Sequence, residues 1–134
     1  MFIIAETDYA IRIIDYLAKN SSLVSSVKIS EATGVSLRFA KNILQKLTGK
    51  DLVVSYQGPS GGYKLNRNPE EISLCDVYEA IQGPVVLGRG LSKEKSCDCR
   101  EDQSPYFEIF IKLSKEIEDR LCEVRFSTSK VDDP

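Results

Sequence analysis

The spacing of apolar residues predicts helices over most of this 134-residue chain. In the first of them, from about Thr7 to Asn20, apolar residues recur every three or four positions, which is typical of a helix with one buried face. That face consists of Ala10, Ile13, Ile14, Leu17 and Ala18.

Residues 26–50 carry the start and stop signals of two short helices joined by a tight turn. Ser25 or Ser26 can cap the first helix, Gly34 is a stop signal, and Ser36 can cap the second helix. Three residues of the first helix are expected to point inward, namely Val27, Ile29 and Ala32. This order of signals predicts a helix-turn-helix.

The second helix of the pair separates an apolar face from a polar one. Its apolar face repeats at helical spacing and consists of Ala40, Ile43, Leu44 and Leu47. The opposite face consists of Arg38, Lys41, Asn42 and Gln45. Arginine and lysine suit guanine and phosphate, whereas asparagine and glutamine suit adenine. From Ser36 to Lys50 there are four basic residues and no acidic one, although an ordinary solvated helix usually mixes both signs.

A glycine-rich hairpin is predicted directly after this helix, between Leu52 and Leu65. Apolar and aromatic residues favour strands on both sides, and positive φ is expected at the reversal, which contains Gly58, Pro59, Gly61 and Gly62. A phosphate-binding loop is a poor alternative because its glycine spacing and its Gly-Lys-Ser/Thr signature are absent. An ordinary β-turn is the alternative, but the preceding basic helix favours the wing of a winged helix.

Charge distribution supports a polyanionic partner. The chain has 18 basic and 20 acidic residues, a net charge of −2, which on average argues against nucleic acid. Residues 36–68 nevertheless hold six basic residues against Asp51 alone, so that this segment is +5 and the remainder −7. Nucleic-acid affinity follows the local field. The alternative is a solvated charged face.

The second half of the chain contains two more predicted helices and a loop. Ser73 and Asp76 have capping-box spacing, and the helix that they open stops at Gly83 and Pro84. After a long loop, Pro105 opens a helix that we expect to run to about Phe126. Its apolar residues at heptad-like spacing are Tyr106, Phe110, Leu113, Ile117 and Val124.

That late helix follows a compact domain that is already complete, so its apolar stripe is expected to meet the same helix of a second chain. Packing back on the first helix is the alternative. We therefore expect a mainly α protein with a small β-hairpin. It would comprise a winged helix-turn-helix DNA-binding domain over 1–82, a cysteine-containing sensor loop over 83–104, a dimerisation helix over 105–126 and a polar tail over 127–134.

Several function classes are not expected. The chain has no histidine, no Gly-x-Ser-x-Gly elbow and only scattered carboxylates, which argues against an enzyme. No 18-residue apolar run occurs, and the N-terminus reaches Glu6 without a signal-peptide pattern, so we expect a cytoplasmic protein without a membrane partner. In that reducing setting the four cysteines are expected to be free, metal-bound or redox-active.

Each cysteine has its own interpretation. Cys75, on an amphipathic helix, is expected to be a small buried apolar residue. For Cys122 two roles remain open, that of a small buried apolar residue and that of a metal ligand. Cys97 and Cys99 lie in a charged loop where packing is uncommon, and metal binding and thiol oxidation are the two readings.

Three stretches together resemble the Rrf2 family of winged-helix transcription regulators: Thr7–Arg12, Val35–Ser36, and Gly58–Leu65 with its Gly-Gly-Tyr wing. The resemblance extends over about residues 1–126. It implies a homodimer formed through Tyr106 to Val124, bound to double-stranded DNA with recognition helices in adjacent major grooves and wings near the minor groove.

Carried over by position, the resemblance places Arg38, Lys41 and Asn42 against bases. With the face and hairpin described above, the expected DNA-binding set is Ser36, Arg38, Lys41, Asn42, Gln45, Lys46, Gln57, Ser60 and Lys64. Gln57 stands where family wings commonly have arginine, which weakens the expected cationic contact in the minor groove.

The resemblance also implies a sensing site. Cluster-binding relatives have three cysteines, each separated by five residues, whereas this loop has only Cys97 and Cys99. Iron–sulfur clusters generally need four ligands. Asp8 aligns with a carboxylate that a nitric-oxide-sensing branch supplies from the partner subunit, and Cys122 is a candidate fourth ligand. Asp8 is otherwise a favourable charge at a helix N-terminus.

The sequence thus predicts a dimeric regulator that senses redox, iron–sulfur or nitric-oxide status through the cysteine loop. Two alternatives remain: a thiol-switch regulator that lacks a cluster, and a winged-helix protein-interaction module without a cofactor.

Overall fold

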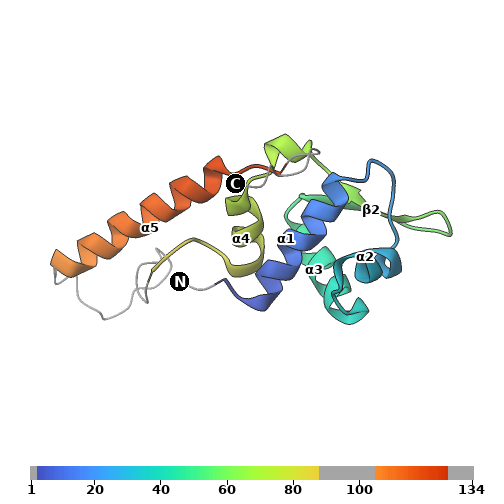
Figure 1. Cartoon of the computed structure of the whole chain (residues 1–134), viewed down its shortest axis with the longest axis horizontal. Coiled ribbons are helices and arrows are strands. Elements are labelled where there is room, and N and C mark those ends of the chain that lie inside the picture. The colour runs from blue at the N-terminus through green and yellow to red at the C-terminus, as the bar shows by residue number, and fades with distance from the viewer. Residues whose placement is uncertain (1–2, 88–104, 127–134) are drawn as a thin grey trace.

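The computed structural model describes residues 3–87 and 105–126, which form helices and one two-stranded hairpin. In chain order the elements are α1 (Ala5–Ala18), α2 (Ser26–Thr33), α3 (Leu37–Gly49), β1 (Val53–Tyr56), β2 (Gly62–Leu65), the 3-10 helix η1 (Pro69–Glu71), α4 (Leu74–Gln82) and α5 (Pro105–Glu123). The hairpin and α5 extend from opposite ends of the molecule (Figure 1). The predicted fold class is confirmed. No helix in the described ranges has the length and apolar character of a membrane span.

Helix α1 lies at the centre of the core, in contact with α2, α3, α4 and β2. It begins and ends two residues earlier than the apolar spacing predicted. The predicted face is confirmed, because all of its members are buried: Ala10, Ile13, Ile14, Leu17 and Ala18. Thr7 is also fully buried, and its hydroxyl donates to Gln82 Oε1 at 2.6 Å, which ties the start of α1 to the end of α4.

The predicted helix-turn-helix signals are present in α2 and α3. Ser25 caps α2 by accepting from the Lys28 N–H, and Gly34 closes the helix in the left-handed region with φ 76°. The inward set was wrong in part, because only Ile29 is buried. Val27 lies about 200° around the helix from Ile29 and is 51% exposed, and Ala32 is exposed as well.

The hairpin pairs antiparallel, with Val53 opposite Leu65 and Tyr56 opposite Gly62. The turn glycines were expected to let the chain reverse where positive φ is needed, and of them only Gly58 adopts it. Gly61 is needed for a different reason, because a Cβ there would lie 2.1 Å from the Tyr56 carbonyl oxygen. The conformational argument was therefore wrong for Gly61 and Gly62, where close backbone approach excludes a side chain.

The base of the hairpin is joined to the segment between α1 and α2. Val24 and Tyr63 exchange two backbone hydrogen bonds of 3.0 and 2.8 Å. A Cβ on Gly62 would lie 2.7 Å from the Val24 carbonyl oxygen. The orientation of the wing is therefore set by contact with the core and not by the turn alone.

Helix α4 begins with the predicted capping box, in which Ser73 and Asp76 each accept from the other's backbone N–H. It ends at Gly83, as expected, with φ 81°. Its body contacts α1 and α3 on one side and α5 on the other. Helix α4 thus connects α1 and α3 to the late helix α5.

Helix α5 ends at Glu123 and not at Phe126 as predicted. The chain then turns back: Leu74 N–H donates to the Val124 carbonyl at 2.9 Å, and Phe126 N–H donates to the Ile72 carbonyl at 3.0 Å. Phe126 is consequently buried in the main core. Hydrogen bonds to residues distant in sequence ended the helix, which local spacing cannot indicate.

The C-terminal part of α5 packs on α4, and not along α1 as the alternative proposed. Its contacts are made by Ile117, Leu121 and Cys122, which lie against Cys75, Tyr78 and Val85. The heptad-like stripe is therefore divided, because Ile117 faces its own chain while the other members are at least 40% exposed.

We expect Gly61→Ala to lower the free energy of unfolding by about 1–3 kcal/mol, because the new Cβ collides with the Tyr56 carbonyl oxygen. Gly49→Ala is the matched control, since it lies in α3 with no heavy atom within 4 Å of its Cβ position. That change should be neutral or stabilise by up to ~1 kcal/mol. Urea unfolding followed by circular dichroism measures both, and equal stabilities would contradict the close approach.

Candidate nucleic-acid interface and cysteine site

The polar face of α3 is held outward by the burial of the opposite face. The apolar positions Ala40, Ile43, Leu44 and Leu47 are completely buried, whereas Arg38, Lys41, Asn42 and Gln45 are exposed. Within the described ranges, neither Arg38 nor Lys41 takes part in an ion pair. These two cations can therefore meet an external anion without losing a protein partner.

Ser36 has a structural role at the start of this helix. Its side-chain oxygen accepts from the Phe39 N–H at 3.4 Å, as an N-cap. The cap orients the first turn of α3, and with it Arg38. The hydroxyl hydrogen of Ser36 stays available as a donor.

Lys46 differs from the other predicted cations of α3. Its ammonium group forms an ion pair of 2.5 Å with Glu6 of α1. A phosphate would have to compete with that carboxylate, so Lys46 is a weaker candidate than Lys41 for backbone contact.

The predicted wing residues occupy two different positions. Gln57 and Ser60 are exposed at the tip, and the hairpin projects from the body of the molecule (Figure 1). Lys64 lies lower on β2, with its Nζ 5.3 Å from the centre of the Tyr56 ring. That cation–π contact places the charge beside the strands, whereas the tip offers amide, hydroxyl and backbone groups.

Sequence reasoning missed Phe39, which is 55% exposed on α3. Its ring centre is 6.4 Å from that of Tyr9, and the Arg12 guanidinium lies 5.8 Å from the Tyr9 ring centre. The signal was an aromatic residue outside the apolar repeat of its helix. An exposed aromatic beside predicted base-reading residues suits contact with a thymine methyl group.

Of the predicted metal ligands, the structure places Asp8 and Cys122, because Cys97 and Cys99 lie outside the described residues. The Asp8 carboxylate is paired with Arg12 at 2.9 Å, and its side chain is about half exposed. Cys122 is half-buried on α5 against the cluster around Cys75. Asp8 thus lies in the first turn of α1, as the helix-charge alternative requires, and in addition has a charge partner on its own helix.

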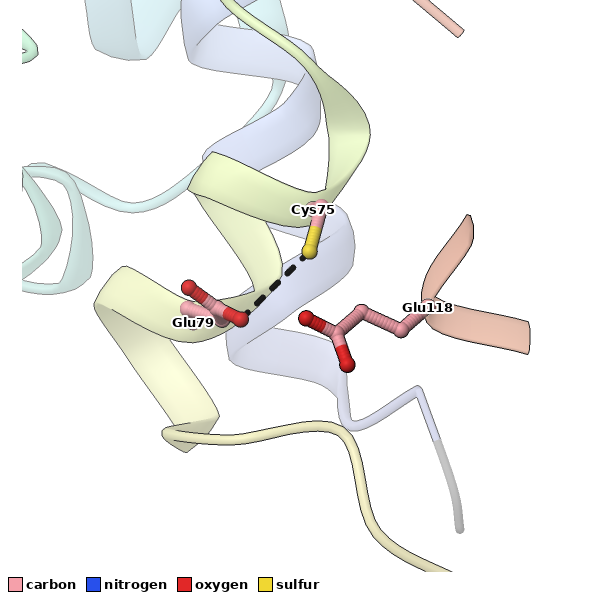
Figure 2. Close-up of side chains that lie close together, drawn as sticks. All are labelled: Cys75, Glu79 and Glu118. Atoms are coloured by element: carbon pink, nitrogen blue, oxygen red, sulfur yellow. Dashed lines mark hydrogen bonds between the residues drawn. The ribbon is translucent and has the colours of Figure 1, made fainter. Parts of the chain in front are cut away.

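Cys75 is buried as predicted, in an apolar cluster with Tyr78 and Val85, but two carboxylates also lie near its sulfur. Its Sγ donates to Glu79 Oε1 at 3.5 Å, and Glu118 of α5 points toward both groups (Figure 2). Burial raises the pKa of the Cys75 thiol far above its usual range, and a hydrogen bond with Cys122 and the negative charge of Glu79 act in the same direction. Cys75 is therefore a neutral thiol at physiological pH.

Similarity to known proteins agrees with this geometry. Residues 3–128 match the Rrf2 family, described as "Iron-dependent Transcriptional regulator". The chain is 39% identical over 83 residues to protein aau3 of Rhizobium meliloti, covering 61% of this chain and 54% of that relative. It is 40% identical over 66 residues to the HTH-type transcriptional regulator IscR of Aliivibrio salmonicida, covering 49% and 39% respectively. The matches thus span about half or less of these relatives.

A solved structure extends the likeness to nearly the whole fold. CymR, the global cysteine regulator of B. subtilis, superposes with a TM-score of 0.75 over 93% of this chain and 92% of its own, at 23% identity. At that identity the likeness establishes the fold.

Proposed function

The chain belongs to the Rrf2 family of transcriptional regulators, and from that premise we propose that it binds operator DNA as a homodimer through α3 and the hairpin. The observation that carries this proposal is the exposed cationic and amide face of α3, opposite four completely buried apolar residues. The prediction of a regulator and not an enzyme is confirmed by the family. Sequence-specific contacts, the dimer and the signal are our proposals.

The proposed base contacts follow from side-chain chemistry. Arg38 would pair with guanine O6 and N7, and Asn42 with adenine N6 and N7. Lys41 would supply charge to a phosphate or guanine, and Phe39 an apolar surface for thymine. The acidic remainder of the chain, −7 against +5 for residues 36–68, limits binding away from this face.

The proposed dimer interface is the outward side of α5. Seven large apolar side chains of the α5 region are 40–71% exposed, namely Tyr106, Phe107, Ile109, Phe110, Ile111, Leu113 and Val124. Exposed apolar residues gathered on one helix in this number are typical of an interaction site. Helix α5 projects from the rest of the molecule (Figure 1), so the same helix of a second copy can lie beside it. A two-fold dimer would present two α3 helices to an inverted-repeat operator.

The proposed signal enters through Cys97 and Cys99. Two thiolates suit iron, and the family description names iron. Among the described residues only Asp8 and Cys122 belong to the proposed ligand set, and Asp8 is paired with Arg12. Because this set is incomplete, the proposal has two versions, which both depend on the two loop thiols. In the first version the thiols themselves are oxidised, and in the second, more specific version they bind an iron–sulfur cluster.

For DNA binding, we expect Arg38→Ala or Asn42→Ala to weaken binding to the preferred site by about 1–3 kcal/mol. The promoter upstream of its own gene is the first duplex to test, against a scrambled duplex of equal length. Lys115→Ala removes the same charge from α5, where Lys115 pairs with Asp119, and should leave affinity unchanged. Equal losses on both duplexes would contradict base reading.

The salt dependence of DNA binding distinguishes the proposed contributions of the two lysines of α3, Lys41 and Lys46. Neutralising one phosphate contributes ~0.9 to the slope of log K against log salt, so Lys41→Ala should lower the slope by about that amount. Lys46→Ala should lower it less, because Glu6 already compensates that charge. Fluorescence anisotropy at several salt concentrations measures both, and the reverse order would contradict the assignment.

For the dimer, we expect Phe110→Glu with Leu113→Glu to give a monomer of 15.0 kDa, because charges buried without partners cost several kcal/mol. Ile117 is unsuitable for this test because it packs on α4. Lys115→Glu adds the same carboxylate on another side of the helix and should stay dimeric. Analytical ultracentrifugation measures the mass, and a dimeric double variant would place the interface elsewhere.

For the signal, anaerobically isolated protein should contain iron and sulfide and lose both in the double variant Cys97→Ser, Cys99→Ser. If a thiol switch operates without a cluster, the protein is colourless but its DNA affinity changes on oxidation only when both cysteines are present. Colourless protein whose affinity is indifferent to oxidation and to the double variant would exclude both forms.

A further inference from the structure

Helices α4 and α5 present two matching pairs of metal-binding side chains to each other. Cys75 and Glu79 are four residues apart on α4, and Glu118 and Cys122 are four residues apart on α5, in the reverse order. Residues at this spacing share one helix face. Each helix therefore offers one thiol and one carboxylate at the α4–α5 contact.

Three of the four side chains converge on one point. The ligand atoms of Cys75, Glu79 and Glu118 all lie within 4.8 Å of one another, and Glu118 extends from α5 toward the other two (Figure 2). Cys122 is not one of these three, but it packs against the apolar cluster that contains Cys75, and a hydrogen bond joins the two thiols. The four groups come from two packed elements that are far apart in sequence, so local helix stability does not account for their meeting.

The two carboxylates have no ion-pair partner in the described ranges, although the charge of Lys115 acts on Glu118. On α5, Asp119 is paired with Lys115 and Glu123 with Arg120. By contrast, neither Glu79 nor Glu118 forms an ion pair with any basic residue of the described ranges. Two negative groups directed at each other beside a buried thiol repel unless a positive charge lies between them.

We propose that Cys75, Glu79, Glu118 and Cys122 bind one divalent transition-metal ion of the zinc type at the α4–α5 contact. Zinc takes four ligands in a tetrahedron and accepts both cysteine sulfur and carboxylate oxygen. Metal–ligand distances of about 2.0–2.3 Å place the ligand atoms about 3.3–3.8 Å apart; Cys75 Sγ and Glu79 Oε1 are already 3.5 Å apart, and the group with Glu118 would have to contract from within 4.8 Å and draw in Cys122. Binding deprotonates both thiols and so releases two protons per ion, whereas Mg²⁺ and Ca²⁺ prefer all-oxygen sites.

The position of the ion would give it a structural consequence that rests on the proposed function. Helix α4 packs on α3, the proposed recognition helix, whereas α5 carries the proposed dimer interface. An ion held by both helices would fix the angle between them, and with it the separation of the two α3 helices in a dimer. The site is independent of Cys97 and Cys99.

The test uses the full-length chain, stripped of metal with a chelator under reducing, anaerobic conditions and titrated with Zn²⁺ against a chromophoric competitor. We expect one Zn²⁺ per chain, and the tetrahedral thiolate spectrum when Co²⁺ replaces it. Glu118→Gln and Cys122→Ser, both at half-buried positions, should each weaken Zn²⁺ binding by at least about tenfold. Circular dichroism verifies that each variant is folded, so the test does not depend on changing buried Cys75.

Two controls locate the ion. Glu116→Gln removes an exposed carboxylate of α5 and should leave Zn²⁺ affinity unchanged, as should the double variant Cys97→Ser, Cys99→Ser. The proposal is overturned if the folded Glu118→Gln and Cys122→Ser variants bind Zn²⁺ like the unmodified chain, or if the loop double variant abolishes binding. Because the readout is metal stoichiometry, failure of DNA binding would leave this result intact and would count only against the proposed function.

Discussion

The burial of one face of α3 is the constraint on which the rest of the structure depends. Its four inward residues are completely buried, and each large aliphatic side chain of this kind stabilises the fold by about 1.5–3 kcal/mol. The helix cannot rotate without exposing them, so its polar face has a fixed direction. Helices α1 and α4 pack on α3, and their orientation follows from the same burial.

The sequence was sufficient for features that arise within one helix or turn. The caps at Ser25, Ser36 and Ser73 and the stop at Gly34 were predictable because each involves residues within five positions of one another. The outward face of α3 was predictable for the same reason, since helical periodicity alone assigns it. Most of the candidate DNA interface could therefore be predicted from residues that are close together in the sequence.

Features that depend on contacts between distant segments were not predictable. The end of α5 is set by pairing with Ile72, and Lys46 is compensated by Glu6 on another helix. Gly61 is required because a carbonyl approaches it, which no residue pattern specifies. The meeting of Cys75 with Glu118 likewise depends on how α4 and α5 pack. In each case the missing information was the relative placement of two elements.

The return of the chain at Phe126 has a consequence for synthesis on the ribosome. This side chain belongs to the main core together with Ile72 and Val77, although it lies 43 positions after Gly83, the C-cap of α4. A nascent chain that has emerged only through α4 contains α3 but lacks a part of the core beneath it. The order of translation thus delays completion of this core until α5 has also left the ribosome, so that the proposed DNA-binding unit and the proposed dimerisation helix are completed together.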